Sequence, residues 1–443
     1  MSRLRDKLLR MKSHTAAQEQ EEGKAEAANT GDAQQEELSA DWKRMDVREE
    51  RTAEGSFLLR ERRYPLSYRH GEHQLDELAS TAAGLIAFQA QKEGASAVNP
   101  IHDRILFFDL ETTGLGIGAG NVPFMVGLGF CSGEQFVVEQ MLIRHPAEER
   151  AMLAYLMDKL PNFTHLATYN GKTFDWPVLM NRFILHGFRQ FAWQPVHLDL
   201  LHPSRSIWRN TLASCKLSHI EEERLGIARV DDVPGMLAPS IYFQFLADQE
   251  PAPLLGVFRH NEIDMISLAC LAIRFAHLLA GQLGERLPYP DGAEELIRTG
   301  MWLEKMQGAP AAEPLYARLQ EWSSPAPQAW LMLAARDKKY GNWPRAVLLW
   351  QKVVQAADGA EWHSWEAHIE LSMYYEHKTK QFEPALALAE TALSLARRRY
   401  TGLVRPGAKQ RAELEGIRKR IERLRLKVRR ISDEYAEARR IVD

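Results

Sequence analysis

Two acidic residues, Asp109 and Glu111, follow an apolar stretch in the segment FFDLETTG (residues 107–114). If this segment is a strand that continues through Glu111, both carboxylates lie on the same face, because strand side chains alternate in direction. Like charges about 4 Å apart repel by roughly 4 kcal/mol at an effective dielectric constant near 20, and a divalent cation removes this repulsion. Because oxygen ligands suit Mg²⁺ or Mn²⁺, the pair predicts a metal site. Two solvent-facing acids at the end of a strand are the alternative interpretation.

Asp175 lies in a second segment, YNGKTFDWP (residues 169–177), which combines a turn with a helix start. The Asn170-Gly171 pair marks a tight turn after an apolar stretch. Pro177 fits the first turn of a helix, where a missing N–H group costs nothing. Asp175 is therefore expected at or near the start of a helix, where it is either a metal ligand or a helix N-cap.

His260 and Asp264 lie four residues apart in the segment HNEID (residues 260–264), directly before a strongly apolar helical pattern. Residues with this spacing share one face of a helix. A neutral histidine beside a bound water is suited to act as a general base, and a simple contact between the two side chains is the alternative. Each of the three segments lies at a strand end or a helix start, where a mixed sheet can bring them together.

In this order, the three segments resemble the motifs of the DEDD exonuclease superfamily, which has a ribonuclease-H-like fold. FDLETTGL resembles the first motif, and YNGKTFDWPVL resembles the second, especially as it occurs in the proofreading domains of family-B polymerases. As a whole, the chain is similar to the YprB-type ribonuclease-H-like proteins, which carry this domain ahead of a helical region. The resemblance covers about residues 100–280 well and the helical part loosely.

The resemblance implies a 3′–5′ exonuclease that hydrolyses phosphodiester bonds of DNA or RNA with two Mg²⁺ or Mn²⁺ ions. Asp109 would bridge both ions, Glu111 and Asp264 would bind the ion that holds the attacking water, and Asp175 would hold the second ion. His260 would deprotonate or orient the nucleophile. Superfamily members with a histidine usually have the spacing HxxxxD, whereas this chain has HxxxD, so the role of His260 stays open.

Two other functions are compatible with the same residues. One is a nucleic-acid- or protein-binding scaffold with an inactive nuclease fold, and the other is a structure-specific endonuclease on the same fold. All four acids are present, which favours an enzyme over the scaffold. The sequence does not separate an exonuclease from an endonuclease, because that depends on whether the cleft blocks an internal strand.

The elements that must position these residues indicate an α/β fold. The segment SFLLRERRYPL (residues 56–66) predicts a strand that ends at Tyr64-Pro65. Apolar segments predict strands at residues 104–110, 121–129 and 135–143, followed by shorter strands at 165–169 and 197–200. Helices are expected at 148–160, 175–186 and 217–225. Strands first, and then alternating helices and strands, predict a ribonuclease-H-like mixed sheet of five to six strands flanked by helices.

Beyond about residue 290 the pattern is helical. Trp330, Ala334, Ala346 and Trp350 have spacings that recur 39 residues later, which is typical of tetratricopeptide-like helix pairs, with ordinary helical hairpins as the alternative. We therefore expect a disordered segment at residues 1–54, the exonuclease domain at 55–290, a tetratricopeptide-like domain at 291–400 and a basic C-terminal helix at 401–443. The helical domain is a candidate surface for a protein partner.

The distribution of charge also bears on function. The net charge is −3, but residues 397–430 contain 14 Lys and Arg against 3 Asp and Glu, a local charge of +11. This segment is either a phosphate-binding tail or a solvated helix face. The same alternatives apply to a set of basic residues after the 197–200 strand: Arg205, Arg209, Lys216, Arg224 and Arg229. Trp208 and Phe174 are candidates for stacking on a base, with core packing as the alternative.

Cysteine content and hydropathy limit the remaining classes. The three cysteines, Cys131, Cys215 and Cys270, show no CxxC spacing, so neither a disulfide framework nor a cysteine zinc site is expected. No run of about 18 uncharged apolar residues occurs, so we expect no membrane-spanning helix. The basic N-terminus lacks the features of a secretory signal, which makes the cytoplasm the expected location.

Overall fold

The computed structural model describes residues 38–89, 98–114, 116–118, 120–357, 365–400 and 407–442. The chain divides into two units, residues 1–44 and 45–443. The described part of the first unit contains helix α2 (Ala40–Arg44). Most of the segment expected to be disordered, residues 1–37, lies outside the described residues. All further statements concern the second unit.

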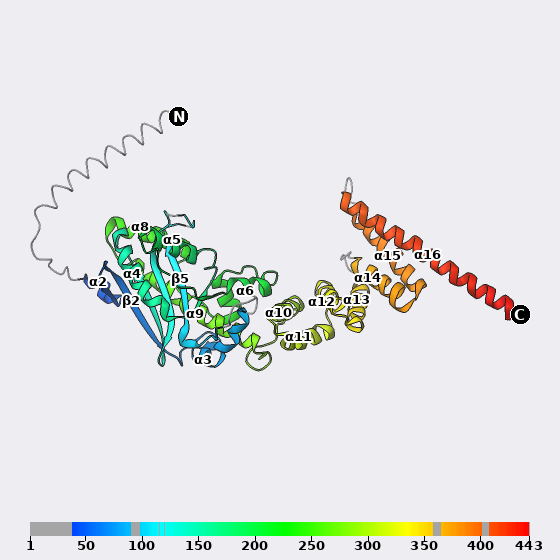
Figure 1. Ribbon diagram of the computed structural model, residues 1–443, viewed down its shortest axis with the longest axis horizontal. Coiled ribbons are helices and arrows are strands. Elements are labelled where there is room, and N and C mark those ends of the chain that lie inside the picture. Colours follow the sequence, from blue (N-terminus) through cyan, green and yellow to red (C-terminus); the bar gives the residue numbers. More distant parts are fainter. Residues whose placement is uncertain are drawn as a thin grey trace, which may run out of the picture. The chain divides into compact units, whose positions relative to one another are not determined.

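A mixed sheet forms the core of the first half of this unit (Figure 1). Within the described residues the sheet has seven strands, in the order β1 (Val47–Thr52), β2 (Gly55–Pro65), β7 (Gln135–Leu142), β6 (Pro123–Ser132), β5 (Ile105–Thr112), β8 (His165–Thr168) and β9 (Val196–Asp199). The pairs β5–β8 and β8–β9 are parallel, and the other pairs are antiparallel. This confirms the expected mixed sheet flanked by helices.

The sheet has one strand more than the expected five to six. The additional strand, β1, falls within residues 1–54, so the expectation of disorder up to residue 54 is wrong for this stretch. Its sequence, VREERT, shows little apolar character, which is why the pattern gave no strand signal. The strand lies at the edge of the sheet, and pairing along its whole length with β2 stabilises it.

Helices cover both faces of the sheet, as neighbouring residues of β7 demonstrate. Glu139 accepts a hydrogen bond of 3.0 Å from Tyr155 of helix α4 (Glu149–Lys159). The next residue, Gln140, donates one of 2.7 Å to the Phe258 carbonyl of helix α9 (Leu254–Leu279). Because adjacent strand residues point to opposite faces, α4 and α9 lie on opposite sides. This explains why all of β7 after Gln135 is buried.

The other elements of this half are short. The helices are α3 (Glu77–Thr81), α5 (Asp175–Leu185), α6 (Leu201–Trp208), α7 (Leu217–Ile220) and α8 (Ala238–Asp248). Strands β3 (Arg69–His70) and β4 (His73–Gln74) form a separate two-stranded sheet. The sequence pattern predicted α5 and α7 but neither α6 nor α8. Helix α8 is fixed by stacking of Tyr242 on Phe124, with ring centroids 4.2 Å apart.

The second half is helical throughout its described residues. It contains α10 (Ala293–Lys305), α11 (Ala309–Glu321), α12 (Pro327–Tyr340), α13 (Trp343–Ala357), α14 (Glu366–Tyr374), α15 (Phe382–Tyr400) and α16 (Ala408–Val442). Consecutive helices pack as hairpins, and ion pairs between residues 32 apart join successive hairpins: Arg336–Glu304, Arg345–Glu313 and Lys338–Glu370. The contacts therefore repeat along the chain, while the tetratricopeptide-like identity of the hairpins stays a prediction.

Some basic residues of helix α16 form ion pairs within the molecule. Arg420, Arg423 and Lys427 surround the fully buried carboxylate of Glu376 at 2.8–3.0 Å. Although burial raises the pKa of Glu376, hydrogen bonds from Arg423 and Lys427 hold it at about 2. These three side chains therefore have a structural partner, and fewer charges of the helix are available for phosphates.

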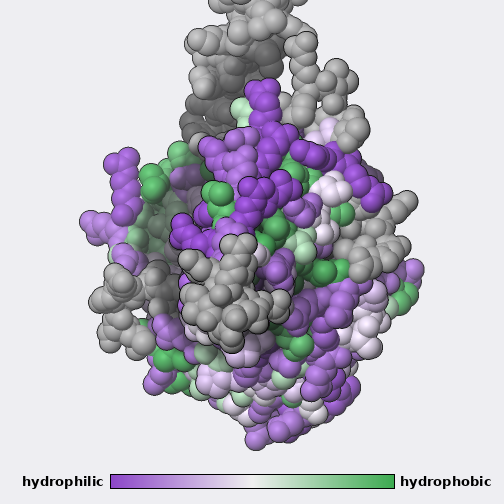
Figure 2. All heavy atoms as spheres, turned by 90° about the vertical axis from the view of Figure 1, so that its right-hand side faces the viewer, coloured by the Kyte–Doolittle hydropathy of each residue, from purple (hydrophilic) through white to green (hydrophobic). Residues whose placement is uncertain are grey.

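Surface polarity varies over short distances. On the face displayed in Figure 2, hydrophilic residues predominate and hydrophobic residues are scattered among them. Isolated apolar residues on a surface are usual in proteins and need no binding partner. Among the described residues, no helix combines the length and hydropathy that a membrane-spanning segment requires.

Candidate active site

Strand β5 places Asp109 and Glu111 at its carboxyl end. The preceding residues of the strand are fully apolar and buried between β6 and β8. Asp109 lies opposite Gly127 and Glu111 opposite Met125 in the register with β6. The two acids are two residues apart in an extended strand, so their side chains project from the same face. Glu111 is 8% exposed.

Asp175 is the first residue of α5, directly after a tight turn that follows β8. The turn is fixed by Asp199, whose carboxylate accepts hydrogen bonds from the backbone N–H groups of Asn170 (2.9 Å) and Lys172 (3.1 Å). At Gly171, any Cβ atom would lie 2.5 Å from Cβ of Thr168, so only glycine fits. Phe174, not Asp175, occupies the N-cap position, and backbone N–H groups of Asp175 and Leu110 donate to the carboxylate of Asp175.

Helix α9 contributes His260 and Asp264, which face each other one turn apart. His260 Nε2 lies 3.6 Å from Asp264 Oδ2. The exposed fractions of the two side chains are 16% and 14%. The shared helix face expected from their spacing is therefore present, and both groups remain accessible to solvent.

The pKa values show that the four carboxylates form one electrostatic cluster. Burial raises the pKa of Asp109 well above its usual range, and the charges of Asp175, Asp264 and Glu111 raise it further. Burial, with Asp264 and Asp175 adding to it, raises the pKa of Glu111 to about 8. Burial raises the pKa of Asp175 to about 7. These acids cannot all ionise together at neutral pH without a compensating cation, so the donor set fits divalent metal ions with oxygen ligands.

Arg229 supplies one positive charge at the edge of this cluster. It forms ion pairs with Asp264, with the buried carboxylate of Glu221 at 2.6 Å, and with Asp232 at 3.1 Å. Although burial opposes it, these carboxylates raise the pKa of Arg229, so the guanidinium is permanently charged. The expected phosphate contact of Arg229 is therefore replaced by a role in holding Asp264 and the loop that follows α7.

Asp232 also contacts His260. His260 Nδ1 lies 2.9 Å from Oδ1 and 3.0 Å from Oδ2 of this carboxylate. Arg229 Nη1 lies 3.1 Å from the same Nδ1, while Nε2 is the nitrogen that faces Asp264. Gly235 lies against the same ring, since a Cβ atom there would be 3.1 Å from Nε2. The loop thus fixes the orientation of His260.

Asn261 connects Asp109 to a buried polar network. Its side-chain amide donates to Asp109 Oδ2 at 3.1 Å, and its oxygen accepts a hydrogen bond of 3.0 Å from Gln140. Arg60 donates in turn to Gln140 at 2.7 Å. Asn261 and Gln140 are both fully buried. This network orients the carboxylate of Asp109 from behind, which is a typical arrangement for a metal ligand.

A basic cavity of about 430 Å³ lies beside the turn that carries Asp175. Its lining includes Lys172 from this turn, Arg205 and Arg209 from α6 and the segment after it, and Arg298 and Lys305 from α10. Asp199 lines the same cavity and raises the pKa of Asp175 through its charge. The cavity and the acidic cluster are therefore close neighbours.

Two of the other residues proposed for substrate contact, Trp208 and Arg224, have structural partners. Trp208 is 1% exposed, packs on Phe275 with ring centroids 5.6 Å apart, and donates to Glu295 at 2.8 Å. Core packing is therefore its role. Arg224 pairs with the same glutamate at 2.7 Å. Phe174 is half-buried, and Lys216 is exposed.

Sequence reasoning missed Asn261, Asp232 and Gly127. Asn261 and Asp232 lie close to residues that were singled out, but neither residue type is distinctive at its position. A possible signal for Gly127 is glycine within an apolar strand, which often marks a close approach of another group.

Comparison with known proteins agrees with this architecture. Residues 106–276 match a family model described as RNase_H superfamily. The chain is also 33% identical over 396 residues to the uncharacterized protein YprB of Bacillus subtilis (strain 168). The aligned region covers 88% of this chain and 93% of YprB. The match extends well beyond the nuclease half and includes most of the helical region. The chain therefore belongs to the YprB family of the ribonuclease H superfamily.

Proposed function

We propose that this chain is a metal-dependent 3′–5′ exonuclease that hydrolyses phosphodiester bonds of DNA or RNA. The observation that carries the proposal is the cluster of Asp109, Glu111, Asp175 and Asp264, in which burial raises the pKa values of the first three and the neighbouring carboxylates raise those of Asp109 and Glu111 further. The superfamily fold supports a nuclease and a nucleic-acid substrate. The exonuclease reaction and its direction rest on the resemblance of the motifs.

The four carboxylates are the residues that would hold the cations. Two bound divalent ions would neutralise the scissile phosphate and lower the pKa of the attacking water. The hydrogen bond from Asn261 keeps Asp109 oriented toward the cluster. Arg229 limits the movement of Asp264 through a charged contact.

His260 is proposed to accept the proton of the attacking water at Nε2. Asp232 holds the other ring nitrogen at 2.9 Å and stabilises the positive imidazolium that forms. The water oxygen forms a bond to phosphorus while the bond from phosphorus to the 3′-oxygen of the preceding nucleotide breaks. The products are a 5′-phosphate mononucleotide and a strand with a new 3′-hydroxyl.

The basic cavity is proposed to bind the phosphates of the substrate strand. Lys172, Arg205 and Arg209 are exposed and available to phosphate oxygens. Phosphate contacts of this kind position a strand without reading its sequence. The cavity lies on the Asp199 side of the acidic cluster. A nucleic-acid strand bound in the cavity would therefore extend toward the phosphodiester bond that is cleaved.

The test compares substrates with different ends in the presence of Mg²⁺ or Mn²⁺. Single- and double-stranded DNA and RNA, labelled at the 5′ end, are expected to shorten stepwise from the 3′ end, and a blocked 3′ end is expected to stop the reaction. Cleavage of a circular substrate would instead support the endonuclease alternative. No cleavage of any substrate would support the binding-scaffold alternative.

A further inference from the structure

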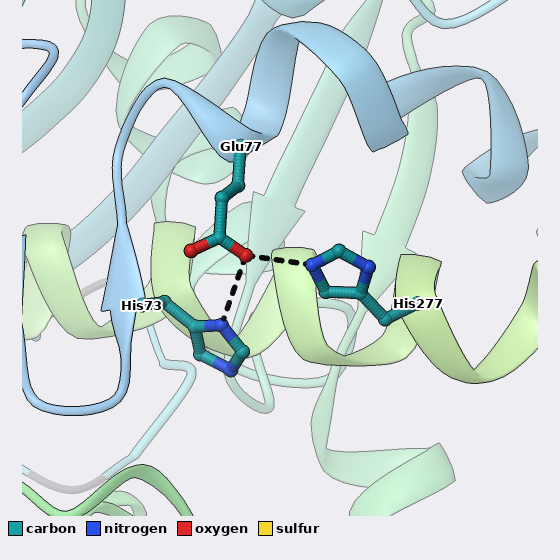
Figure 3. A group of neighbouring side chains, drawn as sticks. All are labelled: His73, Glu77 and His277. Carbon is teal, nitrogen blue, oxygen red and sulfur yellow. Dashed lines mark hydrogen bonds and ion pairs between the residues drawn. The ribbon is translucent and has the colours of Figure 1, made fainter. Parts of the chain in front are cut away.

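A second group of side chains suited to metal binding lies outside the acidic cluster. It consists of His73 on β4, Glu77 on α3 and His277 near the end of α9 (Figure 3). Glu77 Oε2 lies 2.7 Å from His277 Nε2 and 3.4 Å from His73 Nδ1. These three atoms all lie within 4.8 Å of one another. In Figure 3 both rings direct a nitrogen toward the same carboxylate oxygen.

The groups behind these atoms have the arrangement of an outer shell around metal ligands. His277 Nδ1 lies 2.5 Å from Oε1 of Gln282, and Glu77 Oε1 accepts a hydrogen bond of 2.8 Å from the backbone N–H of Gln74. A proton on His277 Nδ1 satisfies Gln282 and leaves a lone pair on Nε2. Metal-binding histidines typically donate their second nitrogen to an oxygen in this way.

The burial of the two histidines also bears on metal binding. His73 and His277 are each 3% exposed, so both rings are shielded from solvent. Among the described residues, His73 Nε2 has no hydrogen-bond partner, and Nδ1 is the nitrogen that faces Glu77. Glu72, at 3.2 Å, balances the charge of the nearby Arg274.

The contact between His277 and Glu77 accommodates either a proton or a metal ion between the two atoms. With its proton on Nε2, a neutral His277 donates an ordinary hydrogen bond of 2.7 Å to Glu77. With its proton on Nδ1, toward Gln282, the lone pair of Nε2 is available to a metal ion. His73 faces the same carboxylate oxygen at 3.4 Å and would give a metal ion its third ligand.

We propose that His73, Glu77 and His277 bind one Zn²⁺-class cation that is separate from the catalytic ions. Two imidazoles and one carboxylate, with a fourth position for water, are a usual ligand set for Zn²⁺, whereas Mg²⁺ prefers oxygen ligands alone. Asp264 lies 13 residues before His277 on the same helix, a distance of about 20 Å at 1.5 Å per residue. The ion fastens the segment of β4 and α3 to the last turn of α9.

The test uses the full chain with the catalytic cluster disabled by Asp109→Asn and Asp264→Asn, freed of metal by a chelator. Titration with Co²⁺ is expected to give the visible absorption of a tetrahedral site with a stoichiometry of about one, and Zn²⁺ is expected to displace it. In this background, His277→Gln and Glu77→Gln are expected to abolish the absorption. His145→Gln, which changes a histidine with 59% side-chain exposure, is the matched control and is expected to keep it.

Thermal unfolding provides a second readout that does not require the variants to bind metal. Zn²⁺ is expected to raise the melting temperature of the background protein and of His145→Gln, but not that of His277→Gln. Absence of a saturable tetrahedral spectrum in the background protein would overturn the proposal, and so would an unchanged spectrum in His277→Gln. Because nuclease activity is not measured, failure here is distinguishable from failure of the proposed function.

Discussion

The side-chain amide of Asn261 donates a hydrogen bond of 3.1 Å to Asp109 Oδ2, and it occupies the space that a side chain at position 127 would need. A Cβ atom on Gly127 would lie 2.2 Å from Oδ1 of Asn261. Gly127 pairs with Asp109 across β5 and β6. The absence of a side chain on one strand therefore allows a helix residue to reach an acid on the next.

We predict that Gly127→Ala reduces nuclease activity by about 10–100-fold, the usual effect of losing a contact that orients a metal ligand. The methyl group displaces Asn261, and the carboxylate of Asp109 loses its orientation. The measurement is the initial rate of nucleotide release at saturating Mn²⁺. Gly120→Ala is the control, because a Cβ atom there has no neighbour within 4 Å. Equal rates for both variants would show that Asn261 does not matter for the reaction.

His260 and Asp232 are expected to act as one unit. His260→Ala should lower kcat by about 10²–10⁴-fold if it is the general base. Asp232→Asn should lower kcat less, because the imidazole remains but loses its orientation and charge partner. The double variant is then expected to be no slower than His260→Ala alone, since effects within one catalytic unit are not additive. Multiplicative losses in the double variant would mean that Asp232 acts independently of His260.

The raised pKa values predict how stability depends on pH. Burial, with the neighbouring charges, raises the pKa of Glu111 to about 8, and burial raises that of Asp175 to about 7, whereas unfolded carboxyl groups titrate near about 4. Between about pH 4 and about pH 8, these groups therefore bind more protons in the folded chain than in the unfolded chain. Without divalent ions, the contribution of these two groups to the free energy of unfolding therefore decreases as the pH rises from about 4 to about 8.

Thermal unfolding in a chelator at pH 5, 6.5 and 8 measures this dependence. Glu111→Gln is expected to weaken it, because the amide does not titrate. Mg²⁺ is expected to stabilise the wild type more at pH 8 than at pH 5, since the ionised carboxylates bind it. Melting temperatures of the wild type and Glu111→Gln that change in parallel with pH would contradict the electrostatic interpretation.

The basic cavity should contribute to the salt dependence of substrate binding. Substituting Lys172, Arg205 and Arg209 with glutamine is expected to reduce the slope of log K against log salt by about 2–3, at roughly 0.7–0.9 per lost phosphate contact. The matched control substitutes three exposed basic residues of α16, Lys419, Arg429 and Arg430, and is expected to change the slope less. A larger change in the control would indicate that the C-terminal helix holds the strand.

The local parts of the fold were predictable from the sequence. Strand β5 and helix α9 carry long apolar patterns, and the turn before Asp175 contains the Asn170-Gly171 signal. These patterns predicted the strand, the turn and the helix on which the four acids lie, but α9 begins at Leu254, ahead of the apolar pattern that follows Asp264. Strand β1 was missed because its pairing with β2, rather than its own composition, determines its conformation.

Contacts between distant residues were not predictable in this way. Asn261 has no distinctive pattern, and its contact with Asp109 depends on the strand register at Gly127. Glu77 and His277 are 200 residues apart in the sequence. Such pairs are set by the packing of α9 on the sheet and on α3, which a single sequence does not reveal.

The most direct test of the central claim is the cleavage rate of Asp109→Asn compared with that of the wild type on one end-labelled strand. The substitution keeps the shape of the side chain and removes the charge that the cluster needs to hold divalent ions. We predict that wild-type cleavage is abolished by a chelator and restored by Mg²⁺ or Mn²⁺. The variant should fold normally and lose at least about 10³-fold in rate, which corresponds to several kcal/mol. A folded Asp109→Asn variant that cleaves at the wild-type rate would contradict the assignment of the acidic cluster as a nuclease site.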